Sequence, residues 1–222
     1  MGYPSWRNQK PLADRFGLEI LIRPGFPPNP PEPKLDFETD AELVAEHLDN
    51  GAHLVGHSYG GTICLLAAAL RPEAVHSLTV TEPNCFSVAG EHAAVREFVA
   101  AAEHLYASGP REPRAFVESF MGIMGLTPQL PDPVPAAVLQ SAQAWMVERF
   151  PWEAQIPLAE LRRTPYPKLV VSGAITHPAQ IAVCDVLEGE LGAKRAILPD
   201  TDHRIMHCPD FNGMLEDFLL GV

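Results

Sequence analysis

The sequence is poor in cysteine and has no long apolar run. Its 222 residues include four cysteines, Cys64, Cys85, Cys184 and Cys208, whose spacing matches neither a C-x-x-C motif nor a disulfide scaffold. We therefore expect reduced, mostly buried thiols, as in cytosolic proteins. No apolar stretch approaches membrane-spanning length, and the N-terminal residues lack the apolar core of a signal peptide. These absences predict a cytoplasmic protein with no membrane partner.

Basic residues are also scarce, because 16 lysines and arginines stand against 28 aspartates and glutamates and give a net charge of -12. A surface of this sign repels phosphate backbones, so we expect no nucleic-acid partner. The chain shows no internal repeat, no glycine-rich phosphate loop and no cluster with metal-ligand spacing. We expect neither a metal nor an organic cofactor.

The most informative stretch runs from Leu54 to Gly61 and reads LVGHSYGG. A short apolar run, residues 52–55, leads into it, and an apolar helical pattern, residues 62–70, follows it. A G-x-S-x-G motif between a strand and a helix places its serine, here Ser58, on a sharp turn with the hydroxyl exposed at the carboxyl end of a sheet. Ser58 is therefore the candidate nucleophile.

The neighbours of Ser58 fit this interpretation. At Gly56 and Gly60 we expect a side chain to collide with the crossing strand or helix. Ser58 also precedes a helix N-terminus, where unpaired N–H groups and the helix dipole favour negative charge. We expect the backbone N–H of Tyr59 to bind an oxyanion.

Strands and helices alternate along the chain. We expect strands over residues 18–22, 75–80, 168–173 and 194–198, and helices over residues 5–16, 36–48, 178–191 and 209–220. This alternation predicts an α/β fold, a mostly parallel sheet with helices on both faces. Ligands of such sheets bind beyond the carboxyl ends of the strands, where Ser58 and Glu82 both fall.

The pattern changes between residues 85 and 167, where three helical segments, near residues 91–108, 113–124 and 134–150, follow one another without a strand. We interpret this region as a helical lid inserted between two parts of the core, residues 1–84 and 168–222. Its apolar side chains belong mostly to the lid's own core, and some are expected to line a substrate pocket. The residues that we assign to this pocket are Phe86, Met121, Met124 and Trp145.

With these features the chain resembles the α/β-hydrolase superfamily over essentially its whole length. The resemblance rests on the GHSYGG turn at residues 56–61, the helical insertion, the late strand at residues 169–173 and a loop that ends in His203 before a C-terminal helix. It implies a serine nucleophile, an acid and a histidine, in that order along the chain.

A serine needs a base within hydrogen-bond reach, and nine histidines compete for that role. We assign it to His203, which follows a strand in a short polar loop. His207, one helical turn away, is the reserve candidate.

The third member, the acid, departs from the usual pattern of the family. The family most often places an aspartate just after the strand that here ends at Gly173, but residues 174–178 read AITHP and contain no carboxylate. Some members take the acid from the end of the strand after the nucleophile helix, and Glu82 stands there. Glu82 could orient His203 and stabilise its imidazolium form. Asp202 adjoins His203 in sequence, which makes it a poor orienting partner, and Asp200 is also a weak candidate.

The resemblance also implies strands before the point at which this sequence starts. In the sheet, one of them would lie between residues 18–22 and the strand before Ser58. The loop at the end of that strand would supply a second oxyanion donor. We therefore expect either an N-terminally shortened chain or a sheet that closes around a gap, with weak or no activity unless Gly2 or Tyr3 supplies that N–H. Loss of one such donor typically costs about 3 kcal/mol of transition-state stabilisation.

The leading hypothesis is a serine hydrolase that cleaves a small, largely apolar ester or related acyl compound through Ser58, His203 and Glu82. Acyl transfer and carbon–carbon bond hydrolysis stay open. The alternative is a hydrolase-like fold without catalysis, which binds a small apolar ligand or a partner.

Overall fold

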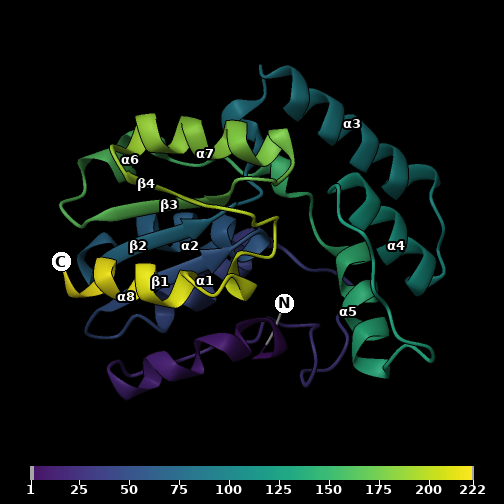
Figure 1. The fold of residues 1–222 in the computed structure, drawn as a ribbon, viewed down its shortest axis with the longest axis horizontal. Coiled ribbons are helices and arrows are strands. Elements are labelled where there is room, and N and C mark those ends of the chain that lie inside the picture. Colours follow the sequence, from purple (N-terminus) through teal and green to yellow (C-terminus); the bar gives the residue numbers. More distant parts are fainter. Residues whose placement is uncertain (1–2, 222) are drawn as a thin grey trace.

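The computed structural model describes residues 3–221, and its centre is a four-stranded parallel sheet with the order β1-β2-β3-β4 (Figure 1). The strands are β1 (Ala52–His57), β2 (Val75–Thr81), β3 (Lys168–Gly173) and β4 (Lys194–Leu198). Short apolar runs in the sequence predict all four of them. The predicted α/β fold class is confirmed.

The predicted helices are present. The α-helices are α1 (Phe37–Glu46), α2 (Tyr59–Leu70), α3 (Ala93–Ser108), α4 (Pro113–Ile123), α5 (Ala136–Val147), α6 (Leu158–Arg163), α7 (Pro178–Leu191) and α8 (Phe211–Leu220). The first helical segment is a 3-10 helix, η1 (Tyr3–Asp14), with Pro11 inside it. Four short 3-10 turns complete the set: η2 (Pro72–Ala74), η3 (Phe86–Ala89), η4 (Pro151–Glu153) and η5 (Ile205–His207). In the described part of the chain, no helix has both the length and the apolarity to cross a bilayer.

The sheet buries both of its faces. One face packs Leu78, Val80 and Val170 against α2 and α7. The other face packs Leu169 and Val171 against α8 and η1. Neighbouring residues of β3 thus point to opposite faces, as the two-residue period of a strand requires. Figure 1 shows α6 and α7 along one side of the sheet and α8 along the other.

Residues 85–167 contain no strand, only helices α3 to α6 and the turns η3 and η4. In Figure 1, α3, α4 and α5 stand together beside the carboxyl ends of the strands. The boundaries of this insertion and its action as a lid stay predictions.

The strand expected at residues 18–22 does not form, so this prediction was wrong. The segment has a suitable apolar composition, but a strand also needs a neighbour that completes its hydrogen-bond ladder. Of the four strands, only β2 pairs with β1, whose other edge is open. Residues 16–21 and β1 instead line the same cavity, and Leu18 and Leu21 remain exposed.

A buried ion triad joins the segment after residue 22 to α1 and to the end of α5. The Arg23 guanidinium pairs with Asp40 (Nε to Oδ2, 2.7 Å) and with Glu148. These side chains are only 11%, 5% and 9% exposed, so the pairs are shielded from water. Arg23 also lies 4.2 Å from the centre of the Tyr59 ring. The triad therefore connects the chain beside Ser58 to the helical insertion.

Replacement of Arg23 by methionine keeps the apolar stem but leaves two buried carboxylates without their cation. We expect a loss of about 3–5 kcal/mol in the free energy of unfolding, measured by urea titration. The control is Arg15→Met, which removes an exposed pair with Glu216 and should cost less than about 1 kcal/mol. Equal losses in both variants would show that the triad does not stabilise the fold.

Candidate active site

Ser58 lies in a strained turn between β1 and α2. Its backbone has φ +56° and ψ −125°, a conformation that side-chain-bearing residues rarely adopt. The turn is fixed on both sides, because the Ser58 N–H donates to the Thr81 carbonyl (3.0 Å) and the Ser58 carbonyl accepts from Gly61 N–H (2.9 Å). The sheet and the first turn of α2 thus hold the strained residue in place.

Glycine is required at two positions of this turn. A Cβ atom at Gly56 would lie 2.5 Å from the Gly60 carbonyl oxygen, and one at Gly61 would lie 2.8 Å from the Cβ of Pro83. At Gly60 the expected collision is absent, because a Cβ there would meet nothing within 4 Å. The turn therefore depends on Gly56 and Gly61 for close packing, and the expectation for Gly60 was wrong.

Ser58, His203 and Glu82 come together at the carboxyl ends of β1 and β2. The Ser58 Oγ lies 3.0 Å from Nε2 of His203, and Nδ1 of the same ring lies 2.6 Å from Oε2 of Glu82. All three side chains are buried. The imidazole therefore lies between a hydroxyl and a carboxylate, one at each ring nitrogen. In this arrangement a histidine can accept the serine proton while the carboxylate fixes its tautomer.

The Glu82 carboxylate is fully buried and accepts three hydrogen bonds. Besides His203, the donors are the Gly173 backbone N–H (2.7 Å to Oε1) and the Thr176 hydroxyl (2.8 Å to Oε2). Its backbone has φ +44°, also in the left-handed region. The last residue of β3 and the segment after it, which lacks a carboxylate of its own, thus supply donors that hold the carboxylate of Glu82, which follows β2. Sequence reasoning missed Gly173 and Thr176.

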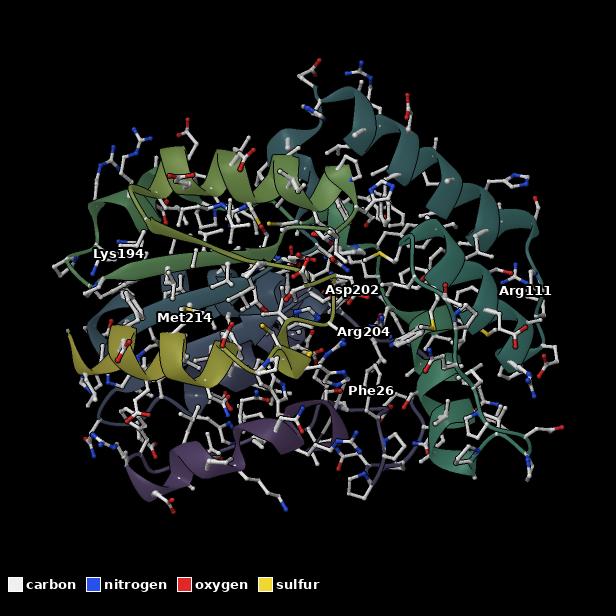
Figure 2. All side chains as sticks on the ribbon, in the orientation of Figure 1. Phe26, Arg111, Lys194, Asp202, Arg204 and Met214 are labelled. Atoms are coloured by element: carbon white, nitrogen blue, oxygen red, sulfur yellow. The ribbon has the colours of Figure 1, made fainter. Side chains whose placement is uncertain are left out.

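The loop that carries His203 packs directly on Gly173. A Cβ at that glycine would lie 1.9 Å from the Thr201 carbonyl oxygen, so no other residue fits without a shift of the loop. The neighbour Asp202 pairs with Arg204 (Nε to Oδ1, 3.0 Å), and Figure 2 labels both residues beside the ends of the strands. The reserve candidate His207 is exposed.

His57 lies beside His203, with 4.6 Å between the ring centres. Its Nδ1 is 2.9 Å from the Thr81 hydroxyl and 3.1 Å from the Thr81 carbonyl. Burial, and secondly the charge of His203, hold the pKa of His57 well below its usual 6.5, although the bond to the Thr81 carbonyl acts in the opposite direction. His57 is therefore a neutral neighbour of the candidate base near pH 7.

Tyr59 is the first residue of α2, so its backbone N–H has no acceptor within the helix. Its side chain is structural: the hydroxyl donates to the Arg149 carbonyl (3.0 Å), and burial raises the pKa of the phenol. The predicted role of the N–H as an oxyanion donor stays a prediction. Of the two expected sources of a second donor, Gly2 lies outside the described residues, and the Tyr3 N–H stays a prediction.

A cavity of about 650 Å³ opens beside Ser58 and His203. All four residues that the sequence assigned to a substrate pocket line it: Phe86, Met121, Met124 and Trp145. It also continues along the open edge of β1, past residues 16–21. Within residues 3–221, no group of three His, Cys, Asp or Glu side chains is placed to hold a metal ion.

Residues 2–211 match the family model described as the alpha/beta hydrolase family. The chain belongs to the α/β hydrolase family. The resemblance seen in the sequence is thereby confirmed.

Among the curated relatives are proteins named pimeloyl-[acyl-carrier protein] methyl ester esterase. The protein from Aeromonas hydrophila is 30% identical over 125 residues, which cover 54% of this chain and 48% of that protein. The protein from Chromobacterium violaceum is 36% identical over 74 residues, 33% of this chain and 29% of that protein. The match therefore spans less than half the length of either relative.

A solved structure, of a membrane phospholipase A described as a bacterial virulence factor, superposes with a TM-score of 0.67 and 22% identity. The alignment covers 100% of this chain and 76% of that chain. At this identity the likeness concerns the fold, in agreement with the parallel sheet and its flanking helices.

The glycine at position 56 gives a direct test of the strained turn. Gly56→Ala should lower the free energy of unfolding by about 1–3 kcal/mol or more, because its methyl group overlaps the backbone of α2. The matched control is Gly60→Ala, which meets open space and should be neutral or slightly stabilising, as alanine is in helices. Urea unfolding measures both, and a Gly56→Ala protein as stable as Gly60→Ala would contradict the packing.

The buried, neutral His57 makes the free energy of unfolding depend on pH. Below pH 6.5 the unfolded chain binds a proton at His57 that the folded chain does not, so stability falls as the pH drops, by up to about 1.4 kcal/mol per pH unit. His57→Gln should therefore flatten the dependence of unfolding free energy on pH between 6.5 and 5. An unchanged slope in His57→Gln would refute the assignment.

Proposed function

We propose that this chain is a serine hydrolase that cleaves small, largely apolar carboxylic esters. Ser58 Oγ attacks the ester carbonyl carbon, and Nε2 of His203 takes the serine proton and then delivers it to the leaving alcohol. Glu82 accepts a hydrogen bond from Nδ1–H and stabilises the imidazolium form. The backbone N–H of Tyr59 binds the oxyanion at the positive end of α2. Water then releases the acyl group from Ser58 by the same proton route.

One observation carries the proposal, the unbroken series of hydrogen bonds from Ser58 through His203 to Glu82. A serine hydroxyl is a weak nucleophile, and a base placed at 3.0 Å is what activates it. The family membership of the chain supports the same reaction class.

The ester class rests on the lining of the cavity and on the relatives. Phe86, Met121, Met124 and Trp145 present aromatic rings and thioethers, which favour apolar acyl or alcohol groups. The two relatives named as methyl ester esterases point to an ester rather than an amide.

Turnover of a short p-nitrophenyl ester tests the triad. Ser58→Ala should abolish hydrolysis, and Glu82→Gln should lower kcat by about 10⁴-fold, because glutamine removes the charge and favours the wrong histidine tautomer. The melting temperature of Glu82→Gln should change little, since the amide has nearly the shape of the carboxylate.

The control is Asp202→Asn, which alters the carboxylate next to His203 in sequence but outside the hydrogen-bonded series. Its turnover should stay within about threefold of the wild type, as expected for a surface change. If Asp202→Asn loses as much activity as Glu82→Gln, Glu82 is not the acid. If the wild type shows no Ser58-dependent turnover of any ester, the chain is a binding protein with a hydrolase fold.

A further inference from the structure

Two buried amides, far apart in sequence, meet at the wall of the cavity. Nε2 of Gln180, in the first turn of α7, donates to Oδ1 of Asn84 at 2.8 Å. Gln180 is fully buried, and Asn84 is 6% exposed and lines the cavity beside Ser58. Neither residue belongs to the series formed by Ser58, His203 and Glu82.

The bond to Gln180 determines which end of the Asn84 amide faces the cavity. With Oδ1 occupied, the NH2 group points away from Gln180. Among the described residues, none accepts a hydrogen bond from Nδ2 of Asn84, and this atom is not fully enclosed, whereas Oε1 of Gln180 is enclosed without a partner. Nδ2 of Asn84 therefore reaches open space, and the open space beside Asn84 is the cavity.

Asn84 is also fixed relative to the nucleophile. Its backbone N–H donates to the Ser58 carbonyl at 3.2 Å. In a trans peptide the carbonyl and the following N–H point in opposite directions, so the backbone N–H of Asn84 lies across the Ser58–Tyr59 peptide from the Tyr59 N–H. The side-chain amide of Asn84, held by Gln180 at the cavity wall, is thus a donor separate from the Tyr59 N–H that we propose as the oxyanion donor.

We propose that the Asn84 amide binds a second hydrogen-bond acceptor on the substrate, a keto, ether or further ester oxygen near the scissile ester, and that Gln180 is its positioning residue. This inference rests on the proposed function and narrows its substrate class. An ester without such an oxygen would leave the amide donor desolvated and unpaired, which is how buried polar groups discriminate between substrates.

Matched ester pairs test the inference. Methyl 3-oxopentanoate and methyl pentanoate differ by one oxygen on the acyl side; 2-methoxyethyl pentanoate and butyl pentanoate differ by one on the alcohol side. For each pair, kcat/KM of the ester with the extra oxygen is divided by kcat/KM of the ester without it. This ratio is compared between the variant and the wild type, so that the intrinsic reactivity of the esters cancels. Asn84→Leu, close in shape, should lower the ratio for at least one pair by about tenfold or more. Gln180→Met should lower the same ratio through loss of orientation, and the exposed Asn50→Leu should leave it unchanged.

The same pairs, measured as dissociation constants in the Ser58→Ala background, separate the two proposals. If the wild type hydrolyses the esters and the ratios in Asn84→Leu stay within about twofold of the wild-type ratios, the role of Asn84 is overturned and the esterase is left intact. Equal losses on every ester also overturn it, since they indicate a general defect. Asn84-dependent selectivity in binding, without turnover by the wild type, keeps the Asn84 site and overturns the esterase. Absence of both binding selectivity and turnover overturns both.

Discussion

The short contact between the Glu82 carboxylate and the His203 imidazole is the interaction on which the site depends. A buried carboxylate is costly unless hydrogen bonds satisfy it, and here donors from Gly173 and Thr176 join the imidazole to do so. Because the carboxylate comes from β2, the backbone donor from β3 and the imidazole from the loop after β4, one side chain ties three strand ends together. Because all four strands are parallel, their carboxyl ends lie together on the side of the sheet where Ser58 is found.

This assembly needs strained backbone and very close packing. Ser58 and Glu82 both have positive φ angles. Each directly follows a strand that is paired with a neighbouring strand as far as its last residue. Gly56 and Gly173 allow α2 and the His203 loop to approach the sheet more closely than any side chain permits. The stability of the parallel sheet therefore holds these residues in conformations that they would not adopt alone.

Sequence reasoning succeeded where the signal was local. Apolar runs of strand length and amphipathic helical patterns gave the four strands and the helices, and the GHSYG motif indicated the turn. Glu82 was selected because it ends a strand on the catalytic edge. The failures involve partners distant in the chain: residues 18–22 have a strand's composition but no neighbour to pair with. The donors at Gly173 and Thr176, and the pairing of Asn84 with Gln180 across 96 positions, leave no local pattern to detect.

The central claim is that Ser58 is an activated nucleophile and not an ordinary buried serine. A fluorophosphonate probe tests it most directly, because such reagents phosphonylate a serine only when a base removes its proton. After incubation and proteolysis, mass spectrometry of the peptide that contains Ser58 should show stoichiometric modification, lost when the protein is first unfolded in urea. A folded protein that takes up no label at Ser58 would contradict the account.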